Sequence, residues 1–167
     1  MSPLPELSLL KNCRIWNADQ ANDELFDVYL WGHRVFRIMP AGVKPESLGG
    51  EWVELDLRGR VLLPAGVDLQ VHLRVPGQEQ KELPLTGLMA SLRGGVCAVL
   101  TMPNTKPVID SPQVIDLANE KLKDAKEQTG VEVFYTVAMT KNQEGREAVD
   151  ASVFRGRSDV LALTDDG

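Results

Sequence analysis

Four short polar segments of the sequence each follow an apolar stretch, and together they carry residue types that can bind a metal ion and an anionic substrate. An imidazole and a carboxylate, as in His72 and Asp165, can hold a divalent metal ion. A guanidinium, as in Arg74, can bind a substrate carboxylate in a bidentate manner. The amide of Asn104 can both donate to and accept from a planar ring amide. The four segments are 70–74, 102–105, 139–142 and 164–167.

Each of these residues also has an ordinary structural interpretation when it is considered alone. His72 could be a loop histidine, Arg74 a member of a surface ion pair, and Asn104 a turn residue after a proline. The run 165–167 could be a helix N-cap or a loop near a chain end. His33 stands next to a turn glycine and is interpreted as structural. The argument for a site is that four chemically compatible groups fall at equivalent places in the pattern.

The elements that must position these groups begin at Pro64. Apolar strand patterns alternate with helical patterns, and the strands are apolar on both faces, as in a parallel sheet covered by helices. Such sheets carry their chemistry at the carboxyl ends of the strands. A doubly wound open sheet and part of a TIM barrel, which needs eight strands and about 250 residues, both fit this pattern. The expected strands are 66–69, 96–100, 131–137 and 160–163, and the expected helices are 83–93, 111–128 and a weaker one near 144–151.

The N-terminal residues show strand patterns separated by turns and no helical pattern. Residues 40–50 are rich in proline and glycine and predict a loop. We therefore expect a small β-rich module over 1–63 and an α/β region over 64–167. The expected strands of the module are 7–16, 28–31, 35–38, 52–57 and 61–63.

Composition excludes several classes of protein. The chain has 167 residues, 43% of them hydrophobic, and a net charge of −6 without a cluster of Lys and Arg, which argues against nucleic-acid binding. No apolar run approaches the roughly 20 residues of a membrane span, and residues 1–6 lack the basic start of a signal peptide. Cys13 and Cys97 are interpreted as buried thiols of strand interiors, without a disulfide. These features favour a cytoplasmic protein.

Three landmarks resemble those of the dihydroorotase family, in the family's order and across essentially the whole chain. Residues 63–77 resemble its signature, in which a strand ends in His-x-His-x-Arg and a Pro-Gly follows. Residues 93–95 and 101–107 resemble the next landmark, with Met-Pro-Asn-Thr at its core. Residues 164–167 resemble an Asp-Asp-Gly found at the fourth strand. The chain is thus similar to the N-terminal part of a dihydroorotase.

The resemblance implies a zinc-dependent cyclic amidohydrolase, with one or two ions, that interconverts N-carbamoyl-aspartate and dihydroorotate. It implies an α/β fold in which an N-terminal β-sandwich-like module precedes the first half of a TIM barrel, about four βα units. His72 would be a metal ligand, and Arg74 and Asn104 would bind the substrate. Asp165 would be the catalytic carboxylate and metal ligand, with Asp166 as the alternative. The metal would lower the pKa of a bound water and polarise the ring carbonyl.

Two departures from the family pattern bear on this expectation. Gln70 stands at the first position of His-x-His, and a neutral amide is a poor zinc ligand compared with imidazole. The family's histidines of the fifth and sixth strands and its general-base Asp of the eighth lie beyond Gly167. We therefore expect a piece of a longer enzyme that is inactive alone. Half a barrel would leave an open strand edge, and we expect it to pair with another copy or with the missing half.

Two other functions are compatible with the sequence. A hydantoinase or allantoinase would share the ancestry, but such enzymes use a carboxylated Lys on the fourth strand, where this chain has Asp165. An inactive scaffold for aspartate transcarbamoylase is the alternative outside catalysis. Gln70 supports the scaffold, and the retained pair of Arg74 and Asn104 counts against it.

Overall fold

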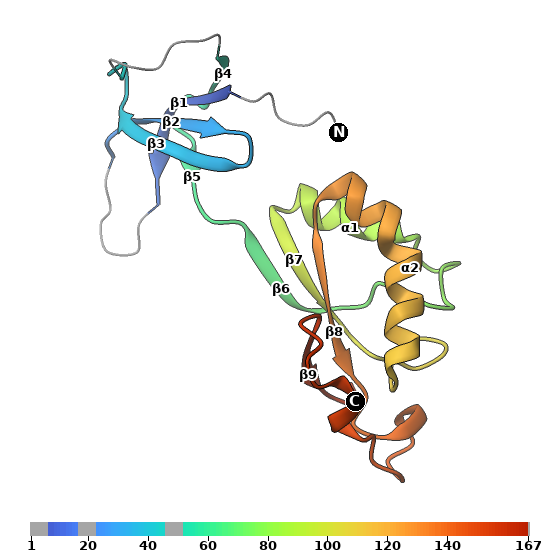
Figure 1. The fold of residues 1–167 in the computed structure, drawn as a ribbon. Helices are drawn as coiled ribbons and strands as arrows, with labels where there is room; N and C mark the ends of the chain where they lie inside the picture. Colours follow the sequence, from blue (N-terminus) through green and yellow to red (C-terminus); the bar gives the residue numbers. More distant parts are fainter. Residues whose placement is uncertain (1–6, 17–22, 46–51, 167) are drawn as a thin grey trace. The chain divides into compact units, whose positions relative to one another are not determined.

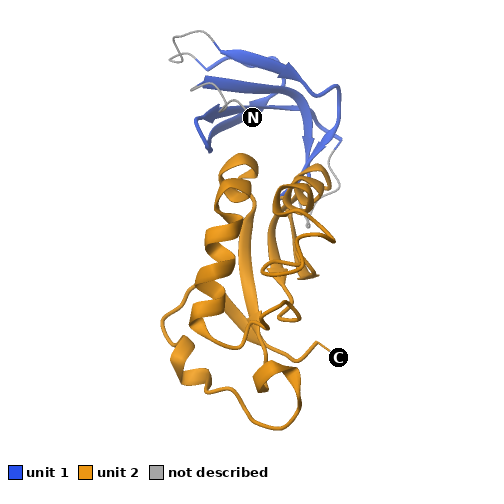
Figure 2. Ribbon diagram, turned by 90° about the vertical axis from the view of Figure 1, so that its right-hand side faces the viewer, with its two compact units in different colours: residues 1–64 blue, residues 65–167 orange. Residues whose placement is uncertain are grey.

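The computed structural model describes residues 7–16, 23–45 and 52–166. The chain divides into two compact units, Met1–Pro64 and Ala65–Gly167, which Figure 2 shows in different colours. The first unit is built from strands, and the second alternates strands with helices.

Unit 1 is a mostly antiparallel sheet around a central first strand. β1 pairs antiparallel with β2 and parallel with β4 and β5, and β3 continues the sheet beyond β2 as a hairpin. Gly32, with φ of +56°, lies in the turn of that hairpin. The strands are β1 (Leu7–Ile15), β2 (Phe26–Trp31), β3 (Arg34–Pro40), β4 (Val53–Asp56) and β5 (Val61–Leu62).

The buried side chains of unit 1 come mainly from β1 and β2. Val28 and Cys13 are fully buried, and the ring of Tyr29 packs edge-on against Trp52 at 5.3 Å between centroids. Asp27, also buried, accepts hydrogen bonds from the backbone N–H groups of Asn12 and Gly42. The described part of this unit forms one sheet, so the second layer of a sandwich is not found among these residues.

Unit 2 contains a parallel sheet in the strand order β6-β7-β8-β9. Helices α1 and α2 lie on one face of this sheet (Figure 1). The elements are β6 (Gly66–Val71), α1 (Pro84–Arg93), β7 (Val96–Thr101), α2 (Pro112–Thr129), β8 (Glu132–Val137) and β9 (Val160–Leu163). The prediction of an α/β region with parallel strands is confirmed.

Local sequence explains where the two helices begin and end. Ser111 is extended and Pro112 begins α2, since proline fits the first helical turn. Gly130 ends α2 in the left-handed conformation, with φ of +70°, and its N–H donates to the Lys126 carbonyl. Ala118 and Leu122 belong to the apolar stripe that α2 buries against the sheet and α1.

The predicted helix near 144–151 is wrong. Thr140 and Ala148 form an antiparallel bridge there, and Gly145 has φ of +68°, which a right-handed helix does not allow. Two 3-10 turns, η1 (Lys141–Gln143) and η2 (Ala151–Phe154), flank this segment. Asp150 caps η2 by accepting a hydrogen bond from the Ser152 N–H.

The core of unit 2 lies between the sheet and its helices. Leu88 of α1, Leu122 of α2 and Val99 of β7 are fully buried there. Cys97 is exposed, so the prediction of a buried thiol is wrong for this residue, which lies near the start of β7, away from the buried end of that strand. No helix among the described residues is long and apolar enough to cross a membrane.

Candidate functional site

The predicted site residues of unit 2 lie where its parallel strands end. His72 follows β6 directly, Asn104 lies three residues after β7, and Asp165 and Asp166 follow β9. Because the strands are parallel, these carboxyl ends share one edge of the sheet, on the side where β8 and β9 end in Figure 1. The structure brings three of these residues into direct contact.

Asn104 connects His72 to Asp166 through its side-chain amide. Its Nδ2 donates to Asp166 Oδ2 at 2.6 Å, and its Oδ1 lies 2.9 Å from His72 Nδ1. A carboxylate only accepts hydrogen bonds, so Asp166 fixes the amide with Nδ2 toward itself and Oδ1 toward the imidazole. His72 must then donate through Nδ1–H, which leaves a lone pair on Nε2 in the neutral ring. That nitrogen is free to bind a metal ion.

The Asp165 carboxylate contacts Thr140 and does not take part in the contacts of His72 and Asn104. Its Oδ1 accepts from the Thr140 N–H at 3.0 Å and its Oδ2 from the Thr140 hydroxyl at 2.8 Å. These two donors hold the pKa of Asp165 below its usual value, with the backbone N–H making the larger contribution. Asp166 therefore occupies the place next to His72 that the sequence assigned first to Asp165, and the His72 Nδ1 to Asp166 Oδ2 distance is 3.8 Å.

Arg74 lies in the loop after β6 with a left-handed backbone, φ of +61°. Its side chain is partly exposed, and the ion pairs within the described ranges do not include its guanidinium. A charged, half-buried guanidinium in this position can bind a carboxylate of a ligand by donating hydrogen bonds to it.

The loop that carries Arg74 packs tightly against the loop that carries Asn104. Gln78 donates through Nε2 to the Asn104 carbonyl at 3.2 Å, and the Lys106 N–H donates to the Pro76 carbonyl at 3.0 Å. Gly77 has φ of +86°, and a Cβ there would lie 1.6 Å from the Lys106 carbonyl oxygen. This close contact fixes the two loops relative to each other.

The described residues do not form a metal site by themselves. His72 and Asp166 are suitable ligands in type and position, but within 7–16, 23–45 and 52–166 no three His, Cys, Asp or Glu side chains form a cluster able to hold an ion. Gln70 is exposed, and its backbone N–H donates to Asp68 Oδ1 at 3.0 Å. His33 is exposed in the hairpin turn of unit 1.

Sequence reasoning missed two residues that organise this site. Thr140 lies in a polar segment that was identified, but its role depends on a partner 25 residues later. Gln78 lies just after the Pro-Gly of the signature and had no distinguishing pattern of its own. Both act through tertiary hydrogen bonds, which spacing alone does not reveal.

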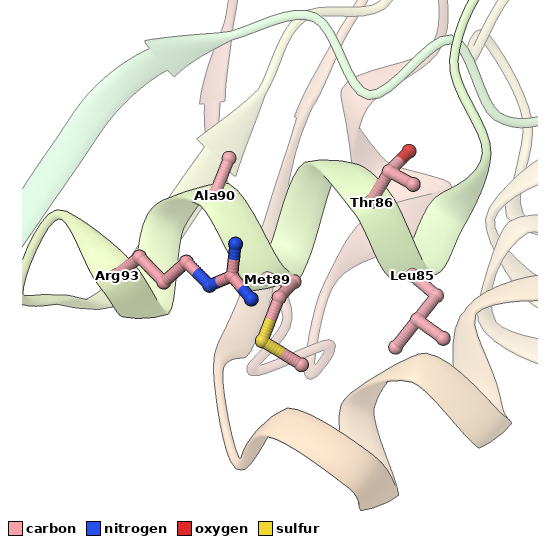
Figure 3. Close-up of a pocket in the computed structure, with 5 residues that line it drawn as sticks. All are labelled: Leu85, Thr86, Met89, Ala90 and Arg93. Carbon is pink, nitrogen blue, oxygen red and sulfur yellow. The ribbon is translucent and has the colours of Figure 1, made fainter.

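A separate cavity of about 470 Å³ lies along α1 (Figure 3). Its lining residues come from this helix alone and include Leu85, Met89 and Arg93, one helical turn apart from each other. None of these residues belongs to the strand-end loops, so the cavity is not part of the candidate site.

Solved structures with a similar fold include two hydantoinases. An L-hydantoinase (dihydropyrimidinase) from Arthrobacter aurescens matches with a TM-score of 0.62 and 21% identity, over 81% of this chain and 29% of that one. A D-hydantoinase matches with a TM-score of 0.57 and 16% identity, over 80% of this chain and 27% of that one. At such identities the likeness shows the fold alone.

Sequence comparison identifies the protein family of the chain. The family model described as "Dihydro-orotase-like" matches residues 59–167. The dihydroorotase of Clostridioides difficile (strain 630) is 33% identical over 159 residues, 95% of this chain and 36% of that protein. The dihydroorotase of Listeria monocytogenes serotype 4a (strain HCC23) is 36% identical over 159 residues, 95% of this chain and 35% of that protein. The chain belongs to the dihydroorotase-like family, and it spans about a third of the length of these curated relatives.

Proposed function

We propose that the protein containing this chain is a dihydroorotase, which interconverts N-carbamoyl-aspartate and dihydroorotate in pyrimidine biosynthesis in the cytoplasm. The observation that carries the proposal is the hydrogen-bonded set of His72, Asn104 and Asp166 at the carboxyl ends of parallel strands. Membership of the family and relatives named dihydroorotase support it.

In this proposal Arg74 and Asn104 bind the substrate. The Arg74 guanidinium pairs with a substrate carboxylate, since its planar donors match the two oxygens. The Asn104 amide binds the ring amide of dihydroorotate, or the ureido group of N-carbamoyl-aspartate, through its second N–H and the remaining lone pair of Oδ1, because the first of each contacts Asp166 and His72. The packing of the two loops through Gly77 and Gln78 keeps these side chains at a fixed separation.

We assign the metal-binding carboxylate to Asp166 in place of Asp165. His72, through Nε2, and Asp166 would hold a zinc ion together with ligands from outside the described residues. When bound, the ion would lower the pKa of a water molecule and polarise the ring carbonyl. The neutral amide of Gln70 contributes little to such a site.

In the proposed longer protein, unit 1 would be one layer of a β-sandwich-like module. Unit 2 would be the first four βα units of a TIM barrel, which the remaining chain would close. The complete protein is proposed to form homo-oligomers.

A scaffold function is the second candidate, because Gln70 stands where the family signature has a histidine. In that case the protein would support a partner such as aspartate transcarbamoylase without catalysing a reaction.

The test uses the protein at its native length, established by intact mass, with metal analysis and assays in both reaction directions. For the enzyme we expect bound zinc and cyclisation of N-carbamoyl-aspartate. Arg74→Lys should raise KM for that substrate about tenfold or more by removing the bidentate contact. The matched control is Arg93→Lys, which changes a guanidinium of the α1 cavity and should leave KM unchanged. A native protein without metal or activity would contradict the enzyme and favour the scaffold.

A further inference from the structure

We propose that Thr140 and Asp165 are positioning residues, which form a clasp that aims the Asp166 carboxylate at Asn104 and His72. The proposal rests on the proposed function in that Asp166 is the metal-binding carboxylate. It gives Asp165 a role different from that of a ligand.

The clasp joins the ends of two neighbouring strands. Thr140 lies three residues after β8, and Asp165 lies two residues after β9. Both carboxylate oxygens of Asp165 accept hydrogen bonds from Thr140, at 3.0 Å from its N–H and 2.8 Å from its hydroxyl. The Asp165 carbonyl accepts a further hydrogen bond from Gln143 Nε2. Residue 165 is therefore held by the segment 140–143 through three contacts.

The direction of the Thr140 hydroxyl is determined by its second partner. The Gly145 N–H donates to Thr140 Oγ1 at 2.9 Å, so the single hydroxyl proton is left for Asp165. Thr140→Val would keep the shape of the side chain and lose the two hydrogen bonds of the hydroxyl, the one to Asp165 and the one from Gly145. Thr140→Ser would keep both hydrogen bonds.

The clasp determines where Asp166 points because the two residues share a peptide bond. Asp166 has φ of +54°, a left-handed conformation that is unfavourable for an L-residue and needs support from its surroundings. Its N–H donates to the Thr164 hydroxyl at 3.1 Å, and its carboxylate reaches Asn104 at 2.6 Å. Release of Asp165 would free this turn and lengthen the contact with Asn104.

The experiment compares Thr140→Val, Thr140→Ser and Asp165→Asn with the parent protein at native length. Thr86→Val is the matched control, because it removes a hydroxyl that donates to the backbone carbonyl of Leu83, just before α1. The first readout is the NMR signal of the Asn104 side-chain amide in metal-free protein. One amide proton should lie downfield because it is donated to Asp166. The second readout is the zinc dissociation constant from chelator competition.

We expect Thr140→Val to remove the downfield shift of the Asn104 amide proton and to weaken zinc binding about tenfold, the usual cost of losing a group that orients a metal ligand. Thr140→Ser should restore both readouts, and Thr86→Val should change neither. If Thr140→Val fails to fold, Asp165→Asn carries the test, since it keeps Thr140 and removes one acceptor.

An unchanged Asn104 amide signal in the folded variants would overturn the clasp. Absence of zinc binding in the parent protein would contradict the proposed function instead. The amide signal would still decide the clasp in that case, because it is read without metal.

Discussion

The Asn104 amide determines the tautomer of His72, and this can be measured directly. The chain contains two histidines, and His33 lies in the other unit, so it is an internal reference for ring nitrogen shifts. We expect the neutral form of the His72 ring to carry its proton on Nδ1. Asp166→Ala should let the Asn104 amide rotate, and the proton should move toward Nε2. Long-range proton–nitrogen NMR reports this change. A His72 ring that is already protonated on Nε2 in the parent chain would contradict the assigned hydrogen bonds.

The residue types of the site were predictable from sequence, but the choice between two adjacent aspartates was not. The rule that parallel sheets carry their chemistry at the carboxyl ends of their strands placed both Asp165 and Asp166 near His72. It identifies the segment after a strand and does not distinguish between neighbouring residues of that segment. Their separation depends on the hydrogen bonds from Thr140 to Asp165 and on the left-handed backbone of Asp166. Both are consequences of the fold, and neither leaves a periodic signal in the sequence.

The two loops that carry Arg74 and Asn104 meet at Gly77, and a substitution there tests how tightly they fit. Gly77→Ala should destabilise the protein by more than Gly156→Ala. The two glycines have nearly the same φ, +86° and +87°, but a Cβ at Gly156 meets nothing within 4 Å. Gly156→Ala should therefore cost only the backbone strain, about 1–2 kcal/mol. Gly77→Ala adds the collision with Lys106. Urea unfolding gives both values, and equal costs would show that the loops can separate freely.

An ion pair ties the same loop to helix α2 and makes stability depend on acid pH. Lys121 Nζ lies 2.8 Å from Glu79 Oε1. This ion pair, with backbone N–H donors from Gly77 and Glu79, lowers the pKa of Glu79 from its ordinary 4.5 to about 2. The folded protein thus binds this proton less readily than the unfolded chain does. The stabilisation is complete above pH 4.5 and disappears as the pH falls toward 2.

Glu79→Gln should accordingly lower the free energy of unfolding at pH 7 and have little effect near pH 2. Because the pair is partly exposed, we expect about 1 kcal/mol or less. Glu127→Gln, an exposed carboxylate of α2, is the control. Urea unfolding at several pH values checks the difference between the two variants. A difference that does not vary with pH would exclude the ion pair as its source.

Elements with strong local signals were predicted well, and elements set by long-range contacts were not. Helix α2 has an apolar stripe, proline at its start and Gly130 at its end, all of which act within a few residues. The segment 144–151 has helix-forming residues, but its conformation follows from the bridge between Thr140 and Ala148 and from Gly145. Local propensity is weaker than these tertiary contacts.

At the scale of the whole molecule, the sheet of unit 2 has two outer strands that each pair on one side only among the described residues. These strands are β6 and β9. Leu69 of β6 is 66% exposed and Leu161 of β9 is 57% exposed. Unpaired backbone groups beside exposed apolar side chains favour addition of another strand. In the longer relatives, about two thirds of the protein lies outside the region that this chain matches, and we propose that this part of the native protein covers both edges.

The 167-residue chain expressed by itself should therefore associate through these edges. Leu161→Lys should shift the chain toward monomer, because a charge on an edge strand opposes pairing with a second strand. The matched control is Leu117→Lys, which changes a partly exposed leucine of helix α2 and should leave association unchanged. Sedimentation velocity over a range of concentrations measures the effect. A stable monomer of the unmodified chain at all concentrations would mean that the edges of β6 and β9 are protected within the chain. There would then be no reason to expect that the region outside this chain, as in the longer relatives, closes the sheet.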